Sequence, residues 1–406
     1  MKRFLQGHAM HPDARSALAL AAAQVEAQRR EPGHASAPTL GWLYLSDHHA
    51  PQAQALLDDA RARWPGVAWV GAVGIGVAAS GVEYFDEPAV ALMLAEMPLD
   101  QFRVFSGAKP LADFAAHAAQ VHADPSTADL AELIIDMADR TATGYLFGGL
   151  ASSRTVTRHI ADAVLQGGLS GVAFSSDVAL VSRVTQGCQP VGPQRRITAA
   201  EHNVVTLLDG EPALDCLLRD LGVTGVEPRE ALPRLRQTLV GLSDPRDAMA
   251  DAPARRGAFG PDVRVRHLVG LDPARRGVAV ADRLEAGMQL AFCSRDTVAA
   301  RRDLVRICSE VRDEVEPEAL ETAAALARQG AEPVDALLGA AQGAIAGAVY
   351  VSCSGRGGPH FGAPSAELQI VRHALGDVPL VGFFAAGEIA RHHLYGYTGV
   401  LTVFRA

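Results

Sequence analysis

The segment Ser352–Gly358 brings a thiol, a guanidinium and three glycines together within seven residues, in the order Ser-Cys-Ser-Gly-Arg-Gly-Gly. Glycines such as Gly355 let the backbone approach a ligand closely and present its N–H groups to an anion. Arg356 in such a loop can bind a carboxylate through two parallel hydrogen bonds. It can equally pair with a structural acid in a tight turn. The pattern indicates a ligand-binding loop, and both roles of Arg356 are open.

Cys353 lies in this loop, and His360 follows it seven residues later. A catalytic thiol needs a base and a third group that orients the base. A small thiol buried at the end of a strand is the simpler interpretation, because nothing in the spacing brings the two side chains together. We therefore assign Cys353 and His360 to the lining of the ligand site and predict no catalytic residue.

Glu388 follows the apolar run Val381–Ala386 and Gly387. A carboxylate at the end of a buried strand is costly unless it is paired or faces a binding site. Together with Arg356 it would match a zwitterion, with the guanidinium for the carboxylate and Glu388 for the ammonium group. Direct pairing of Glu388 with Arg356 is the alternative. A further interpretation is an enzyme that uses Cys353 or Glu388.

The doublet Gly148-Gly149 and the nearby Ser152 form an N-terminal counterpart of this loop. Gly149 would allow a close backbone approach and Ser152 would supply a hydroxyl, although a plain bend between strand and loop explains the same residues. Asn203 precedes a predicted strand at 204–208 and is assigned to the same cleft. These residues complete the predicted ligand site.

Several common functional motifs do not occur in the chain. Residues 71–76 carry three glycines, but their spacing departs from the G-x-G-x-x-G loop that binds dinucleotides. The motifs G-x-x-x-x-G-K-[ST], H-E-x-x-H and G-x-S-x-G are missing. The histidine pairs 48–49 and 392–393 would point apart on a strand, so no metal site is predicted. A haem held by one histidine is compatible with any spacing and is kept as an alternative.

The elements that position these residues are predicted to be repeated. A strand, a loop, a helix and a second strand follow one another near both ends of the chain, and the apolar stretch 67–77 resembles 378–388. Such repetition indicates duplicated halves with a pseudo-twofold arrangement. Strands that alternate with helices but also follow each other directly predict an α/β fold with mixed sheets and outer helices, such as a layered α/β/β/α stack.

Composition narrows the class of protein. The chain has 406 residues, which favours two domains. A net charge of −9 with no basic stripe argues against nucleic-acid binding, and no apolar run is long enough to cross a membrane. Five cysteines without a C-x-x-C pair are typical of reduced thiols in the cytoplasm.

Five segments resemble the FIST family of sensory domains. Segments 148–152, 186–192 and 208–213 are similar to its N-terminal domain, and segments 351–362 and 382–389 to its C-terminal domain. The resemblance implies a FIST N-terminal domain at 38–213 and a FIST C-terminal domain at 214–406. The helical pattern before them predicts a helical lead-in at 1–37.

The family resemblance implies a small-ligand-binding sensory protein of intracellular signal transduction. The implied ligand is an amino acid or small carboxylate. A bacterial branch of the family is reported to carry haem and to respond to nitric oxide, so a haem-based gas sensor is the alternative. No kinase, cyclase or F-box segment is visible. We therefore expect the output to pass through a signalling partner protein.

Overall fold

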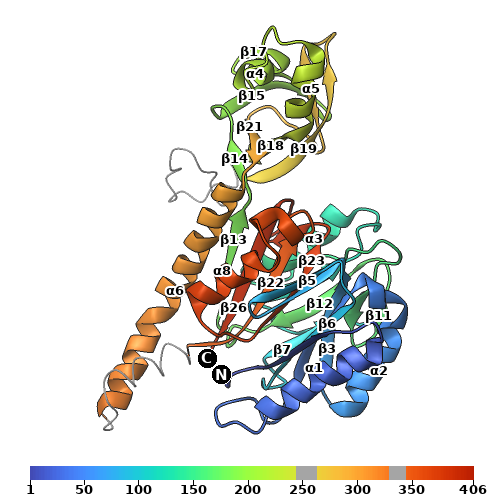
Figure 1. Cartoon of the computed structure of the whole chain (residues 1–406), viewed down its shortest axis with the longest axis vertical. Coiled ribbons are helices and arrows are strands. Elements are labelled where there is room, and N and C mark those ends of the chain that lie inside the picture. Colours follow the sequence, from blue (N-terminus) through green and yellow to red (C-terminus); the bar gives the residue numbers. More distant parts are fainter. Residues whose placement is uncertain (244–262, 329–343) are drawn as a thin grey trace. The chain divides into compact units, whose positions relative to one another are not determined.

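The computed structural model describes residues 1–243, 263–328 and 344–406, which form two compact units (Figure 1). Unit 1 comprises residues 1–185 and 301–406, and unit 2 comprises residues 186–300. Unit 2 is therefore an insertion in the chain of unit 1. Among the described residues, no helix is both long and apolar enough to cross a membrane.

The described residues of unit 1 form three copies of one module, which runs strand, helix, parallel strand, hairpin, antiparallel strand. The first copy comprises β2 (Leu40–Ser46), α2 (Ala53–Arg63), β3 (Ala68–Gly74), β4–β5 (Gly76–Ala79, Val82–Phe85) and β6 (Ala89–Ala95). The second comprises β8 (Ala118–Ala123), α3 (Leu130–Asp139), β9 (Tyr145–Leu150), β10–β11 (His159–Ala161, Val164–Leu165) and β12 (Leu169–Phe174). The third comprises β22 (Ile345–Cys353), α8 (Ala366–Leu375), β23 (Leu380–Ala385), β24–β25 (Glu388–Ala390, His393–Tyr395) and β26 (Thr398–Arg405).

The hairpin of each module pairs with the sheet of another module. Strand β4 pairs with β23, β10 pairs with β3, and β24 pairs with β9. An outer strand completes each sheet, namely β1 (Leu5–Met10), β7 (Phe102–Phe105) or β13 (Leu180–Gln186). The three six-stranded sheets therefore share one strand order: β1-β6-β2-β3-β10-β11, β7-β12-β8-β9-β24-β25 and β13-β26-β22-β23-β4-β5.

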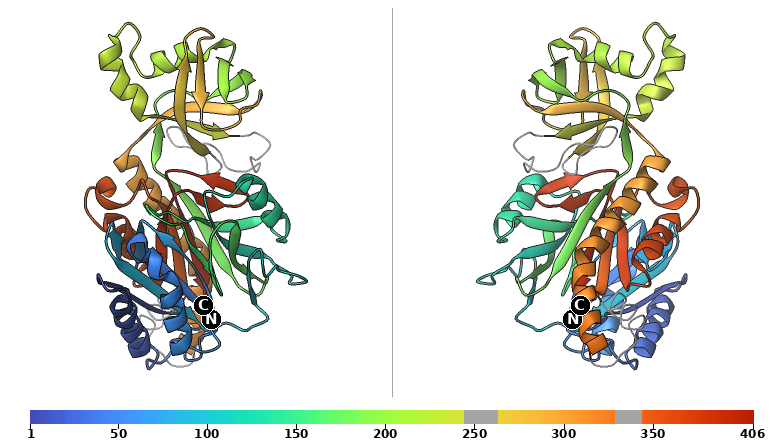
Figure 2. Two further views of the ribbon diagram at one scale, coloured as in Figure 1. Left: turned by 90° about the vertical axis from the view of Figure 1, so that its right-hand side faces the viewer. Right: turned by 90° about the vertical axis from the view of Figure 1, so that its left-hand side faces the viewer.

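The predicted α/β class with mixed sheets and outer helices is confirmed, and Figure 2 shows the helices of unit 1 on the outside of its sheets. The expected pseudo-twofold halves in a two-sheet stack are wrong, because unit 1 holds three modules whose sheets share one core. The third copy is difficult to recognise in the sequence because unit 2 is inserted between β13 and α6 (Thr297–Arg328). In the first module, α1 (Ala14–Gln28) occupies the corresponding place after β1.

The central strands are continuous apolar runs because both of their faces are covered. All residues of β2, β6 and β22 are buried. One glycine in each module permits the close pairing of the two parallel strands. A Cβ atom at Gly71, Gly148 or Gly382 would lie 1.9, 1.9 or 1.7 Å from a carbonyl oxygen of the neighbouring strand. No other residue fits these three positions without moving the backbone.

A polar network crosses the apolar core between β2 and β8. The Trp42 Nε1–H donates to Gln120 Oε1 at 2.6 Å, and Gln120 Nε2 donates to the Tyr44 hydroxyl at 2.7 Å. That hydroxyl also lies 3.1 Å from His122 Nε2. Burial lowers the pKa of His122 to about 3, so its imidazole is neutral. These bonds satisfy the buried polar groups of Trp42, Tyr44 and Gln120 and help to fix the relative position of the two sheets, whereas His122 Nδ1 has no partner among the described residues.

Unit 2 contains a closed antiparallel barrel. Six strands pair in a complete circuit: β15 (Arg195–Glu201), β16 (Val204–Leu208), β20 (Gly277–Val280), β19 (Arg264–Asp272), β18 (Thr238–Ser243) and β21 (Gln289–Arg295). Side chains such as Val205, Leu290 and Phe292 fill its interior. Helices α4 (Ala213–Asp220) and α5 (Pro228–Gln237) and the short strands β14 (Cys188–Pro190) and β17 (Glu211–Pro212) complete the unit (Figure 1). Closure leaves the barrel without open edges.

Candidate functional site

The predicted residues of the C-terminal motifs come together where strands of the third module end. Cys353 is the last residue of β22, and Glu388 is the first of β24 and lies opposite Gly149 of β9. A Cβ atom on Gly149 would lie 2.9 Å from the carbonyl oxygen of Gly387. We call Gly149, Cys353, Arg356, Gly387 and Glu388 the strand-end cluster. Gly355 borders it, since a Cβ atom there would lie 3.7 Å from the Cys353 sulfur.

Arg356 forms a buried ion pair with Glu367 of α8. Its Nε and Nη2 donate to Glu367 Oε1 at 2.8 and 2.6 Å, and both side chains are inaccessible to solvent. Glu367 also accepts hydrogen bonds from the Tyr350 and Ser352 hydroxyls. Of the two roles that the sequence left open for Arg356, this geometry favours pairing with a structural acid.

Glu388 is fully buried and forms hydrogen bonds with Thr398, the first residue of β26. Its Oε2 accepts from the Thr398 N–H at 3.2 Å and from the Thr398 hydroxyl at 2.8 Å. Burial raises the pKa of Glu388 to about 8 despite these bonds. Burial also raises the pKa of the adjacent Cys353 thiol to about 12, which gives no support to a nucleophilic cysteine. Glu388 Oε1 and Arg356 Nη1 lack hydrogen-bond partners among the described residues, so a ligand role for the cluster stays a prediction.

Ser152 links backbone groups of the first and third modules to the second module, in which it lies. Its hydroxyl accepts from the Ile75 N–H at 2.9 Å and donates to the carbonyl oxygen of Phe384. Both hydrogen-bonding functions of the hydroxyl are used in this way, and the side chain is buried. The geometry therefore supports a structural role for this residue.

His360 and Asn203 lie outside the strand-end cluster. His360 is part of the 3-10 helix η2 (Gly358–Phe361) and packs edge-on against Phe361, with 5.4 Å between the ring centroids. Asn203 belongs to unit 2, where its Nδ2 donates to the Val280 carbonyl oxygen at 3.3 Å. The structure thus places Asn203 in a different unit from the other predicted site residues.

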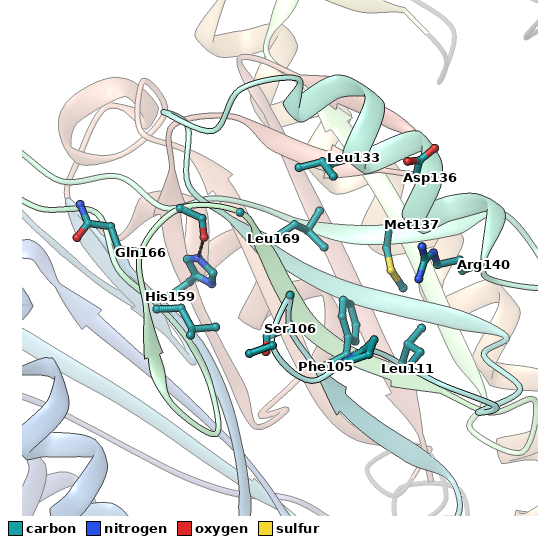
Figure 3. A pocket seen from close by; sticks show the side chains of 16 residues that line it. Phe105, Ser106, Leu111, Leu133, Asp136, Met137, Arg140, His159, Gln166 and Leu169 are labelled. Atoms are coloured by element: carbon teal, nitrogen blue, oxygen red, sulfur yellow. Dashed lines mark hydrogen bonds between the residues drawn. The ribbon is translucent and has the colours of Figure 1, made fainter.

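A pocket of about 570 Å³ opens in unit 1 on the outer side of the second module (Figure 3). This volume is within the range typical of small-molecule sites. None of the residues predicted from the sequence lines it. The lining residues come from the loop after β7, from α3 and from the β10–β12 segment: Phe105–Ala108, Pro110, Leu111, Leu133, Asp136, Met137, Arg140, His159 and Leu165–Leu169.

The floor of the pocket is apolar. Helix α3 forms because Ile134, Met137 and Ala138 recur at helical spacing and bury one face against the sheet. Met137 shares this core with Phe105 and Leu111, all less than 7% exposed. An apolar ligand group placed here would be removed from water on most sides.

Two opposite charges stand at the rim of the pocket. Asp136 and Arg140 are four residues apart on α3 and its C-terminal cap, so they lie on the same helix face (Figure 3). Both side chains are exposed, and neither forms an ion pair with any described residue. A carboxylate and a guanidinium are therefore available to a ligand above the apolar floor.

The wall opposite α3 is held in place by hydrogen bonds. His159 is buried, with Nδ1 2.6 Å from the Ser170 hydroxyl and Nε2 3.0 Å from the Gly167 carbonyl oxygen. Burial lowers the pKa of His159, so its imidazole is neutral at neutral pH. Asp124 accepts from the Gly167 N–H at 3.0 Å. Burial alone would raise the pKa of Asp124, but hydrogen bonds from Ser126 and Gly167 hold this pKa at about 2.

Sequence reasoning missed this pocket because its lining comes from three separate segments. One local signal was available, namely the Gly167-Gly168 doublet, whose positive φ angles of 72° and 73° mark a tight turn. The described residues include no cluster of histidine, cysteine, aspartate or glutamate that could hold a metal ion. The chemistry that the pocket offers is therefore recognition of an apolar group carrying charge at one end.

Comparison with known proteins matches nearly the whole chain. Residues 39–211 match the FIST N domain and residues 213–391 match the FIST C domain. An uncharacterised protein of Mycobacterium tuberculosis strain CDC 1551 is 32% identical over 97% of both chains. An uncharacterised protein of Mycobacterium bovis is 30% identical over 97% of this chain and 96% of its own length. The names of these relatives give no ligand and no activity.

Proposed function

The chain belongs to the FIST family, which is linked to signal transduction, and we propose that it is a sensory protein that binds a small ligand in the pocket beside α3. The ligand class that fits is an amino acid with an apolar side chain or a small apolar carboxylate. The signal would pass to a partner protein. The observation that carries this proposal is the pairing of an apolar floor with two opposite charges at the rim.

The recognition chemistry follows from the two ends of the pocket. Arg140 would bind the ligand carboxylate, and a guanidinium can do so through two parallel hydrogen bonds. Asp136, one helical turn earlier, would bind an ammonium group on the same ligand. The side chain of the ligand would cover Phe105, Leu111 and Met137. A ligand that lacks an apolar group would make no favourable contact with this floor.

The position of the pocket suggests how binding changes the protein. Helix α3 packs against Ile389 and Leu394 of the hairpin contributed by the third module. His159, on the opposite wall, lies in β10, which pairs with β3 of the first module. A ligand between these walls therefore contacts elements linked to all three modules. Any preference of the ligand for one arrangement of the hairpins would shift the population toward it.

A ligand screen tests the proposal. Thermal stability of the purified protein would be measured against amino acids and small carboxylates, and the affinity of each hit by calorimetry. We expect Arg140→Ala to weaken binding by at least about tenfold, since a charge-assisted hydrogen bond contributes about 1.5–3 kcal/mol. Asp136→Asn should weaken the binding only of ligands that carry an ammonium group. Glu132→Gln, on the same helix but outside the pocket, is the matched control.

Two results would contradict the pocket proposal. The first is wild-type affinity of a confirmed ligand for both Arg140→Ala and Asp136→Asn. The second is a Soret band in the purified protein that shifts with nitric oxide, which would favour the haem-based alternative instead. An absorption spectrum recorded before the screen separates these cases.

A further inference from the structure

Two of the five cysteines are neighbours, and they lie beside both connections between the units. The chain enters unit 2 at Gln186, just before Cys188, and leaves it after Ala300, soon after Cys293. Cys188 begins β14, and Cys293 lies in β21, the strand that pairs with β14. The two thiols thus occupy the strands by which the barrel is attached to the rest of the chain.

The strand register places the two side chains on one face of the sheet. Pro190 is directly opposite Cys293, and Cys188 is opposite Arg295, so Cys188 and Cys293 are diagonal neighbours. Side chains two residues apart on a strand point to the same face, so the two thiols share one face of the sheet. Diagonal neighbours have Cα atoms roughly 7–8 Å apart, so closing a disulfide would draw the two strands together. Both residues are buried and reduced. A hydrogen bond with Cys188, together with burial, raises the pKa of the Cys293 thiol.

We propose that Cys188 and Cys293 form a modification site, in which a small-molecule disulfide such as oxidised glutathione converts the thiol pair into an intramolecular disulfide. The Cys188 thiolate attacks one sulfur of oxidised glutathione, forming a mixed disulfide and releasing one glutathione thiolate. The Cys293 thiolate then attacks the Cys188 sulfur, and the second glutathione leaves. Two cysteines lose two electrons and two protons, and oxidised glutathione becomes two glutathione thiols.

Cys188 is the residue that reacts first. It retains 6% exposure, whereas Cys293 is completely buried. The hydrogen bond with Cys188 and burial raise the pKa of the Cys293 thiol, which disfavours Cys293 as the first nucleophile. The other three cysteines, all within the described residues, have no thiol neighbour of this kind: Cys216 contacts Glu211 and Arg219, and Cys353 lies beside Glu388.

The disulfide would tie the entry strand of unit 2 to its exit strand. It would close a loop that contains nearly the whole barrel, and cross-links that close long loops restrict the unfolded chain most strongly. Oxidised protein should therefore open β14 and β21 less often than reduced protein. This input is independent of the ligand pocket, which lies in unit 1.

Thiol counting and mass spectrometry test the proposal on the full chain. Reduced protein would be incubated with oxidised glutathione, denatured, and titrated for free thiols. We expect the count to fall from five to about three, with one cross-linked peptide pair joining Cys188 and Cys293. Hydrogen exchange of the β14 and β21 amides should slow in the oxidised protein. Cys308→Ser is the control that should keep the disulfide, and Cys293→Ser should stop at a glutathione adduct on Cys188.

The proposal is overturned by either of two results. One is a thiol count that stays at five in folded protein after oxidation. The other is a disulfide between other cysteines, or a glutathione adduct on Cys188 that persists while Cys293 is present. The wild-type peptide map decides the question even where a serine variant fails to fold.

Discussion

Replacing Glu388 by glutamine should remove much of the pH dependence of the stability of unit 1. Glu388 is fully buried beside Cys353 and Arg356, and burial raises its pKa from 4.5 to about 8. Below pH 4.5 the carboxyl is protonated in both the folded and the unfolded chain. Between pH 4.5 and 8 the unfolded chain ionises while the buried group stays protonated, so the folded state loses stability as pH rises.

The size of this effect follows from the pKa interval. One pKa unit corresponds to 1.36 kcal/mol, so the interval from 4.5 to about 8 amounts to at most about 5 kcal/mol of unfolding free energy. The loss is complete above pH 8. Glutamine keeps the size of the side chain and an oxygen that can accept from Thr398, but it cannot ionise. Above pH 8 the variant should therefore be more stable than wild type by a few kcal/mol, about 3–5.

Urea unfolding followed by tryptophan fluorescence measures this difference. All three tryptophans, Trp42, Trp64 and Trp69, lie in unit 1, so the signal reports that unit alone. Free energies would be compared at about pH 5 and about pH 9 for wild type and Glu388→Gln. Glu83→Gln should show a smaller effect of the same sign, because burial raises the pKa of Glu83 to about 7. Equal pH dependence in wild type and Glu388→Gln would refute the reasoning.

Two further predictions concern the loops and the modules of unit 1. Arg154→Ala should lower the unfolding free energy by about 2 kcal/mol at neutral pH. Arg154 Nε and Nη2 donate to the buried Asp47 at 2.8 and 2.7 Å, and their loss leaves this carboxylate without its main donor. These bonds lower the pKa of Asp47 despite its burial, so the variant should also lose less stability on acidification, as urea titrations would show. Gly382→Ala should prevent folding of unit 1, because its Cβ would lie 1.7 Å from a backbone oxygen, whereas Gly107→Ala, with no atom within 4 Å, should fold normally. Native tryptophan fluorescence of the Gly382→Ala variant would contradict the claim that only glycine fits between the paired strands at this position.

Local pattern predicted much of the secondary structure. The strand predicted at 204–208 is β16, and the apolar run Val381–Ala386 forms most of β23. These elements could be read from the chain because periodicity and breakers are local properties. The FIST family could also be recognised, since its motifs at 186–192 and 351–362 are short and continuous.

The candidate site shows where sequence reasoning stops. Side-chain type placed Arg356 and Glu388 near each other at strand ends, and the structure brings them together. The partner of Arg356 is Glu367, an acid on α8 that no spacing rule connects to the loop. Asn203 resembled the other candidates by position before a strand, yet it belongs to the inserted unit. A pairing between side chains depends on how distant elements pack, and one sequence does not specify this.

The sequence by itself determined the α/β class, the repeated strand–helix–strand order and the family. Only the tertiary structure decided that there are three modules that exchange hairpins, that residues 186–300 form a separate unit with a closed barrel, and that a pocket opens beside α3. The physical reason is the range of the interactions. Strand and helix formation depends on neighbouring residues, whereas sheet order, barrel closure and pocket lining depend on contacts between residues far apart in the chain.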